Sequence, residues 1–329
     1  MSDLLARVRA GGLLVAGRPV VVLLSGGRDS VCLLDVAVEV AGAPAVSALH
    51  VDYGLRAESG ADAALCRDLC ERLGVALEVV RAPAPPAGGN LQAWARTLRY
   101  ERADALAQAR AADVAAGHTA TDQAETILYR LASSPGRRAL LGMAPRAGRL
   151  VRPLLDVTRE ETAAWCRARG LPWSEDATNE DARFARNRVR ATLLPALRAI
   201  HPGAEANVVR TAELLRDEAA VLDAAVDGVL EGGASVPLAR LRAAPLALAR
   251  LVVVRLAEDA AGALVPRAAA RTEEILALDP ARAWTALDVG DGVRAVVERG
   301  ILRMERRDPS EGPPPGAPAG PSSTRARRP

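Results

Sequence analysis

The feature that most constrains the fold is a strand–loop–helix pattern near the N-terminus. Pro19–Leu24 (PVVVLL) is an unbroken apolar run of strand length, and two glycines and a helical pattern from Asp29 to about Val40 follow it at once. An apolar run without alternation is typical of a strand that is covered on both faces of a parallel sheet. The beginning of the chain therefore predicts a strand followed by a crossover helix.

The same alternation continues through the first 120 residues. We expect further strands at 45–51, 75–80 and 113–117, and further helices at 61–73, 91–110 and 121–131. This order predicts an α/β fold: a doubly wound, mostly parallel sheet in which ligands gather at the carboxyl ends of the strands. Thr158 and Glu161 form a capping-box pattern that opens one more helix, ending at Arg169.

After Pro202 the pattern changes to long helical stretches followed by short strands. Helical patterns cover 204–231, 238–260 and 267–278, and strand patterns at 284–289, 293–297 and 301–305 flank a Gly-Asp-Gly turn. From Arg307 onward seven of 23 residues are proline. We predict a first α/β domain (1–205), a second, smaller helical α+β domain (206–306), and a disordered Pro-rich tail (307–329).

All 43 basic residues of the chain are arginines, and none is lysine. This absence excludes a Walker A loop, a kinase-type strand lysine, a Schiff base to pyridoxal phosphate and a lysyl-adenylate nucleophile. The abundance of Ala, Arg, Gly and Val, which is typical of a GC-rich genome, explains the absence equally well. The composition thus excludes enzyme classes without naming one.

The loop between the first strand and the first helix has the composition of a phosphate-binding site. It reads Ser25, Gly26, Gly27, Arg28, Asp29 and Ser30. The glycines let backbone N–H groups turn toward an anion, and the helix N-terminus adds its dipole and unpaired donors. A carboxylate beside phosphates is repelled unless a cation lies between them, so we infer Mg²⁺ at Asp29. The simpler alternative is an ordinary glycine turn with a helix cap.

This hexapeptide resembles the PP-loop of the ATP pyrophosphatase superfamily. Further segments follow in a set order: HVDYGLR (50–56), Asn90 with Ala95-Arg96 and Arg99-Tyr100, GHTATDQAET (117–126), RPLL (152–155), DATN (176–179), RNRVR (186–190) and LP (194–195). Together they resemble the tRNA(Ile)-lysidine synthetases. The resemblance implies a ligase that uses ATP to adenylate C2 of the wobble cytidine (C34) of a CAU-anticodon isoleucine tRNA. Free L-lysine then displaces AMP to form lysidine. The resemblance also implies that residues 1–205 form the catalytic PP-loop domain and that residues 206–306 contact the tRNA.

His118, Asp122 and Glu125 are spaced so that one face of a helix start can present all three. The two carboxylates suit a cation, either Mg²⁺ or the ammonium groups of lysine, and a carboxylate can accept the proton of an attacking amine. A solvated helix face with acids in its first turn is the alternative. The family has two adjacent aspartates here, whereas this chain has Thr121 before Asp122, so Asp122 holds the only remaining position of that pair.

The basic residues of the chain are concentrated near this site. Net charge is +3 overall, yet residues 130–200 carry 14 arginines against seven acids. Arg186, Asn187, Arg188 and Arg190 lie in one short span, and such a patch suits the phosphates of a tRNA. A solvated helix with the neighbouring acids Asp176, Glu180 and Asp181 is the alternative.

Two other functions remain open. A PP-loop tRNA thiolase would need a carrier cysteine or an iron–sulfur cluster, which Cys32, Cys66, Cys70 and Cys166 fit poorly because no two form a CxxC pair. A nucleotide- or tRNA-binding module without catalysis is suggested only by Thr121. We find neither a signal peptide nor a long apolar run, which predicts a cytoplasmic protein without a membrane segment; homodimer formation stays open.

Overall fold

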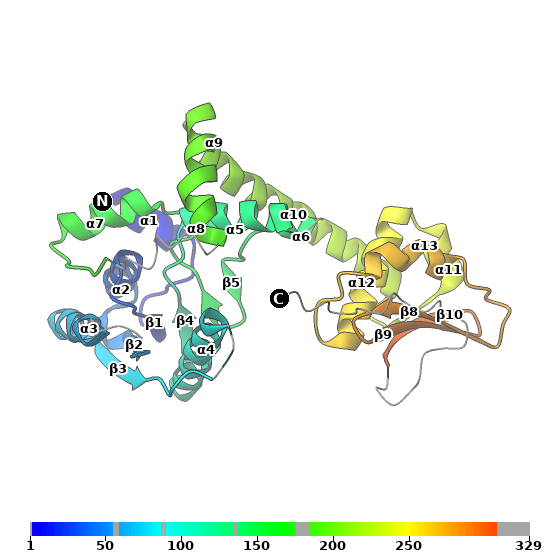
Figure 1. The fold of residues 1–329 in the computed structure, drawn as a ribbon, viewed down its shortest axis with the longest axis horizontal. Helices are drawn as coiled ribbons and strands as arrows, with labels where there is room; N and C mark the ends of the chain where they lie inside the picture. The colour runs from blue at the N-terminus through cyan, green and yellow to red at the C-terminus, as the bar shows by residue number, and fades with distance from the viewer. Residues whose placement is uncertain are drawn as a thin grey trace, which may run out of the picture. The chain divides into compact units, whose positions relative to one another are not determined.

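The computed structural model describes residues 2–54, 59–86, 88, 90–133, 137–175 and 185–307. The chain divides into two compact units, residues 1–216 and 217–329 (Figure 1). Our predicted boundary at residue 205 lies in the first turn of the helix that crosses this division, α10 (Ala204–Leu230). Of the predicted tail, only Arg307 is among the described residues, and the DATN segment and Leu55-Arg56 also lie outside them.

The first unit is built on a six-stranded sheet in the order β3-β2-β1-β4-β6-β5. Its neighbouring strands are parallel except for β5, which runs antiparallel to β6. The prediction of a mostly parallel sheet is therefore confirmed. The strands are β1 (Val20–Leu23), β2 (Val46–Asp52), β3 (Ala76–Arg81), β4 (Asp113–Ala115), β5 (Arg146–Ala147) and β6 (Leu150–Val151).

Helices cover both faces of this sheet because the side chains of the central strand alternate. Val20 and Val22 pack in one cluster with four helices, whereas Val21 and Leu23 pack on the other face against α4 (Leu91–Ala109) (Figure 1). The four helices on the first face are α1 (Ser2–Ala10), α2 (Arg28–Ala41), α3 (Ser59–Leu73) and α7 (Arg159–Ala168). This is the doubly wound arrangement that the sequence predicts.

A further layer of short helices lies against the helix that follows β4. This helix, α5 (Ala120–Ser133), shares a small apolar cluster with Leu194 and Val209. The surrounding elements are α6 (Arg137–Leu140), α8 (Ala185–Arg188), a π-helical turn (Val189–Leu193), α9 (Leu194–Ile200) and α10. They place the predicted RNA-binding span next to α5.

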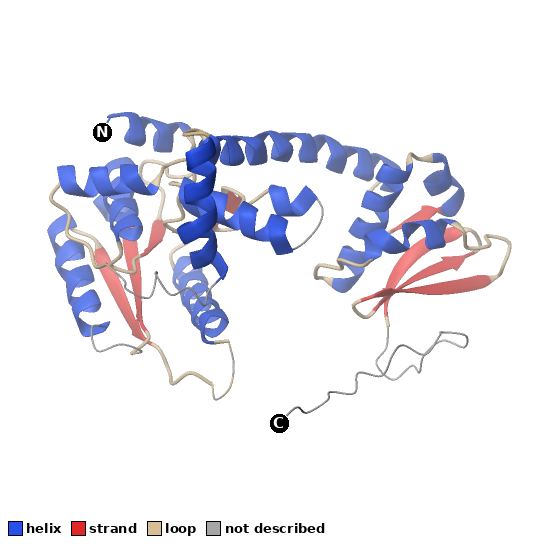
Figure 2. Cartoon of the chain, turned by 45° about the horizontal axis from the view of Figure 1, so that its top comes forward, coloured by secondary structure: helices blue, strands red, loops and turns tan. Residues whose placement is uncertain are grey.

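The second unit packs helices on one antiparallel sheet in the order β7-β10-β9-β8 (Figure 2). Gly290, Asp291 and Gly292 all have positive φ, which a tight turn between β8 and β9 requires. The predicted helical stretch 238–260 is divided by Pro245, which cannot continue a helix. The elements are β7 (Ser235–Pro237), α11 (Leu238–Ala243), α12 (Leu246–Ala261), a 3₁₀ turn (Ala268–Arg271), α13 (Thr272–Leu276), β8 (Trp284–Gly290), β9 (Val293–Glu298) and β10 (Ile301–Arg306).

Several short elements were not predicted from the sequence: α1, the helices α6, α8 and α9, the strand β7 and the two-residue strands β5 and β6. A two-residue strand carries too few side chains to show a period, and α1 precedes the first strand signal. Among the described helices none is both long and apolar enough to span a bilayer.

Candidate active site

The loop 25–30 connects β1 to α2, as predicted. Gly26 has a φ of +86°, a conformation that favours glycine, and Gly27 is the N-cap residue of α2. The Ser30 hydroxyl accepts a hydrogen bond from the Ser25 backbone N–H (3.1 Å) and donates one to the Gly27 carbonyl (2.8 Å). These bonds set the loop over the amino end of a 14-residue helix, where an anion is stabilised.

The segment that follows β4 contacts this loop very closely at Gly117. A Cβ atom at this position would lie 2.9 Å from the backbone oxygen of Asp29 and 3.2 Å from the backbone nitrogen of Ser30. Because backbone atoms cannot give way as a flexible side chain can, only glycine fits here. The close approach holds the next residues, from His118 onward, beside the start of α2.

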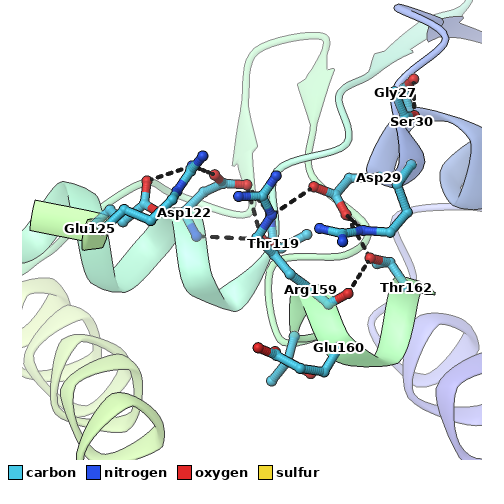
Figure 3. A network of polar contacts seen from close by, with 12 residues as sticks. Gly27, Asp29, Ser30, Thr119, Asp122, Glu125, Arg159, Glu160 and Thr162 are labelled. Atoms are coloured by element: carbon cyan, nitrogen blue, oxygen red, sulfur yellow. Dashed lines mark hydrogen bonds and ion pairs between the residues drawn. The ribbon is translucent and has the colours of Figure 1, made fainter. Parts of the chain in front are cut away.

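Asp29 is surrounded by donors from α2 and α7 (Figure 3). Its Oδ1 accepts hydrogen bonds from the Thr162 hydroxyl (2.5 Å) and from Arg28 Nε (3.1 Å), and its Oδ2 lies 3.3 Å from Arg159 Nε. The side chain retains 16% exposure. Two guanidinium groups therefore balance the carboxylate.

The described residues contain no group of three or more His, Cys, Asp or Glu side chains that could hold a metal by themselves. A magnesium ion at a nucleotide site commonly uses one or two carboxylates and takes its other ligands from phosphates and water. The single carboxylate of Asp29 fits a shared site of that kind and does not fit a metal centre held by protein alone.

His118 follows β4 and lies within electrostatic range of Asp122. Burial lowers the pKa of His118 to about 4; Asp122 opposes the change, while Arg152, Arg96 and Arg99 add to it. Its Nδ1 atom is buried and has no hydrogen-bond partner in the described part of the chain. The imidazole is therefore neutral at pH 7 and offers a ring nitrogen rather than a positive charge.

The two predicted carboxylates both lie in the first turns of α5, but they differ in their surroundings (Figure 3). Asp122 Oδ2 accepts hydrogen bonds from the backbone N–H and the hydroxyl of Thr119, both at 2.9 Å, while its Oδ1 lies 3.6 Å from Arg190. Glu125 is only 2% exposed, and Arg190 donates to both of its oxygens at 2.5 and 3.0 Å. Burial raises the pKa of Glu125, and the bonds from Arg190 partly offset this rise.

The predicted RNA-binding residues lie on α8 and the π-helical turn, next to α5. Arg186 and Arg188 are exposed, whereas Asn187 and Arg190 are half-buried. Arg186 donates to the Thr126 hydroxyl (3.3 Å). This span thus has one arginine engaged with the carboxylates of α5 and others at the surface.

Thr121, which directly precedes Asp122, is 4% exposed. Its hydroxyl has no hydrogen-bond partner within the described ranges. A buried hydroxyl without a partner costs free energy, so nothing in the described contacts explains threonine at this position.

Several residues at the site were missed from the sequence. Arg159 and Thr162 reach Asp29 from 130 or more residues away, and only the capping box that starts α7, present as predicted, marked their helix. Beside His118, the guanidinium groups of Arg96 and Arg99 lie 4.8 and 5.5 Å from the Tyr100 ring centre. The Nε atoms of Arg99 and Arg152 are buried without a partner in the described chain, so the arginines near His118 could bind an anion.

Comparison with known proteins gives one family match. Residues 6–197 match the model of a PP-loop domain family. Curated proteins called tRNA(Ile)-lysidine synthase are similar to this chain. The one from Pseudomonas fluorescens is 43% identical over 61% of this chain and 47% of its own length. The one from Solibacter usitatus is 39% identical over 77% of this chain and 59% of its own length. This chain spans about half the length of these two relatives.

The relative from Symbiobacterium thermophilum, which has the same name, is 38% identical over 92% of this chain and 68% of its own length. Among solved structures, a U34-tRNA thiolase from Methanococcus maripaludis with a [4Fe-4S] cluster aligns with a TM-score of 0.56. It is 18% identical and covers 65% of this chain and 78% of that one. At that identity the likeness concerns the fold alone.

Proposed function

This chain belongs to the PP-loop family and, within it, to the tRNA(Ile)-lysidine synthases, and we propose that it ligates free L-lysine to the wobble cytidine of a CAU-anticodon isoleucine tRNA. The observation that carries the proposal is the 38% identity over 92% of the chain to a relative of that name. The site supports it with a glycine-containing loop at a helix N-terminus, which suits phosphates, and with a pair of carboxylates.

The proposed reaction has two steps. The C2 oxygen of C34 attacks the α-phosphorus of ATP, and diphosphate leaves. The ε-amine of lysine then attacks C2, the C2–O bond breaks, AMP leaves, and the amine loses a proton. The protein must therefore bind a triphosphate, hold an amine near C2 and accept a proton.

We propose that the loop 25–30 binds the ATP phosphates through its backbone N–H groups, the Ser25 and Ser30 hydroxyls and Arg28. Asp29 would hold a Mg²⁺ ion that it shares with the phosphates, and the bound ion would neutralise charge that develops on them. Arg159 lies 3.3 Å from Asp29 and would turn to the phosphates once the ion holds the carboxylate.

The acidic residues of α5 are proposed to receive lysine. Asp122 is the more accessible of the two, with 22% of its side chain exposed against 3% for Glu125. A carboxylate of this pair would take the proton from the attacking amine. His118 is neutral, so its ring can form a hydrogen bond with a substrate beside Asp122 without adding a positive charge there.

We assign tRNA binding to Arg186, Asn187, Arg188 and Arg190, with further contacts from the predicted domain 206–306. The two exposed guanidinium groups, Arg186 and Arg188, suit phosphate oxygens. The substrates, a tRNA, ATP and free lysine, would meet in the cytoplasm.

No observation favours a thiolase. The four cysteines are buried and free, and burial raises the pKa of Cys66 to about 12 and of Cys70 to about 11. A sulfur carrier needs an accessible thiolate, whose pKa is low.

A lysine-dependence assay tests the proposed function. The purified chain is incubated with [α-³²P]ATP and CAU-anticodon tRNA, with and without lysine, and AMP release is followed. We expect AMP release that requires both tRNA and lysine. AMP release that continues unchanged without lysine would rule the ligase out.

A further inference from the structure

One side chain of the candidate RNA-binding span lies in the place proposed for the substrate amine. Arg190 Nε and Nη2 donate to the two oxygens of Glu125 at 2.5 and 3.0 Å, and Nη2 also lies 3.6 Å from Asp122 Oδ1. A single guanidinium group thus bridges both acids of the site.

This contact excludes a second cation at Glu125. Each carboxylate oxygen of Glu125 already accepts a bond from Arg190, and 3% of the side chain is exposed. An ammonium group could reach these oxygens only if the guanidinium moved away. In this conformation lysine can use Asp122, but it cannot use Glu125.

Arg190 lies on an element that also faces RNA in the proposed function. It belongs to the π-helical turn Val189–Leu193, directly after α8, which carries the exposed Arg186 and Arg188. Such irregular turns occur often at functional sites. A polyanion that binds this segment offers phosphate oxygens as alternative partners for its guanidinium groups, and Arg pairs well with phosphate.

We propose that Arg190 is an internal stand-in for the substrate ammonium group and that it sets the order of binding, with tRNA first and lysine second. This inference rests on the proposed function, in which Asp122 and Glu125 receive lysine. Phosphates of the tRNA draw the guanidinium of Arg190 away from Glu125, and the freed carboxylates then bind the amine. Until an RNA substrate is present, free lysine can therefore bind only weakly, through Asp122 alone.

The first test uses the unaltered protein without ATP, so that no turnover occurs. Equilibrium dialysis with radiolabelled lysine measures its Kd with and without CAU-anticodon tRNA. Couplings between two sites commonly change affinity by about 5- to 150-fold, and we expect tRNA to tighten lysine binding within this range. Equal lysine affinity in both conditions would overturn the proposed order.

The second test removes the stand-in cation. Arg190→Gln should bind lysine at least fivefold more tightly than the unaltered protein in the absence of tRNA, and the effect of tRNA on lysine binding should largely disappear. The matched control is Arg198→Gln, which breaks another Arg–Glu pair, that with Glu205 (Nε to Oε2, 2.8 Å), between α9 and α10. We expect the control to bind lysine as the unaltered protein does.

Arg190→Lys keeps a cation but loses the two-point bond to Glu125, and it serves if Arg190→Gln does not fold. We expect it to bind lysine more tightly than the unaltered protein does, but with a smaller gain than the one predicted for Arg190→Gln. Should both Arg190 variants bind lysine no more tightly than the unaltered protein, Arg190 is a structural partner of Glu125 and the inference fails. Lysidine formation by the unaltered protein is scored separately. If no lysidine forms, the proposed function is rejected. If lysidine forms but the Arg190 variants bind lysine no more tightly, only the role of Arg190 is rejected.

Discussion

At the scale of single residues, the site is organised by arginine–carboxylate pairs. Asp29 pairs with Arg28 and Arg159, and Glu125 pairs with Arg190. In a chain without lysine, every permanent cation of the site is a guanidinium group, which binds a carboxylate or a phosphate through two parallel bonds. Each pair can therefore exchange its carboxylate for a phosphate of the substrate.

Asp29→Asn tests the role of the loop carboxylate. The amide is nearly isosteric and keeps a carbonyl oxygen for the Thr162 hydroxyl, but it removes the negative charge that pairs with Arg159 and that we propose for Mg²⁺ binding. We expect kcat for AMP formation to fall at least 100-fold, on the scale of losing one electrostatic contact to a reacting group, while the Kd for tRNA changes less than twofold. Initial rates and filter binding measure the two quantities.

Glu39→Gln is the matched control, because Glu39 lies on the same helix and pairs with Arg169 away from the loop. Its rate should stay within twofold of the unaltered protein. An Asp29→Asn rate as high as that of Glu39→Gln would contradict the role of Asp29.

His118 makes stability depend on pH. Its pKa is about 4 in the folded chain against 6.5 for the free side chain, so between these values the unfolded state binds more protons. The stability that comes from keeping His118 neutral is complete above pH 6.5 and is lost as the pH falls through about 4, by roughly 3 kcal/mol in all. Urea unfolding of His118→Gln at pH 7 and 4.5 should show a smaller loss than the unaltered protein; an equal loss would mean that His118 is protonated freely when folded.

At the scale of elements, the site depends on how closely β4 and α2 approach each other. Gly117→Ala places a methyl group 2.9 Å from the Asp29 carbonyl oxygen. Such overpacking costs about 1–3 kcal/mol, and urea unfolding measures it. Gly60→Ala on α3 is the control, since nothing lies within 4 Å of its Cβ position; it should be neutral or slightly stabilising. Equal midpoints for the two variants would contradict the close approach.

The elements themselves were largely predictable, and their contacts were not. The period of the apolar side chains placed the strands β1 to β4 and the helices between them to within about two residues, because burial sets that period. The pairs Asp29–Arg159 and Glu125–Arg190 join residues about 130 and 65 positions apart. No local pattern encodes which distant arginine reaches a given carboxylate. The sequence therefore did not predict that Arg190, which we assigned to RNA binding, pairs with Glu125.

At the scale of the whole molecule, charge distribution matters more than net charge. The net charge is +3, and 14 of the arginines lie between residues 130 and 200. Binding of tRNA should therefore weaken by on the order of 50-fold between about 50 and 200 mM salt. Arg188→Gln should make the slope of log K against log salt shallower by about 1, the loss of one phosphate contact. Fluorescence anisotropy at several salt concentrations measures both. A flat response would remove this span from the RNA interface.

The central claim is that the chain joins lysine to the wobble cytidine. Mass spectrometry of nucleosides from CAU-anticodon isoleucine tRNA, after incubation with the purified chain, ATP and isotopically labelled lysine, tests it most directly. We predict one new nucleoside, with the mass of cytidine plus labelled lysine minus water, that is absent when ATP or lysine is left out. Unmodified cytidine at the wobble position despite ATP consumption, or a sulfur-containing nucleoside in its place, would contradict the account.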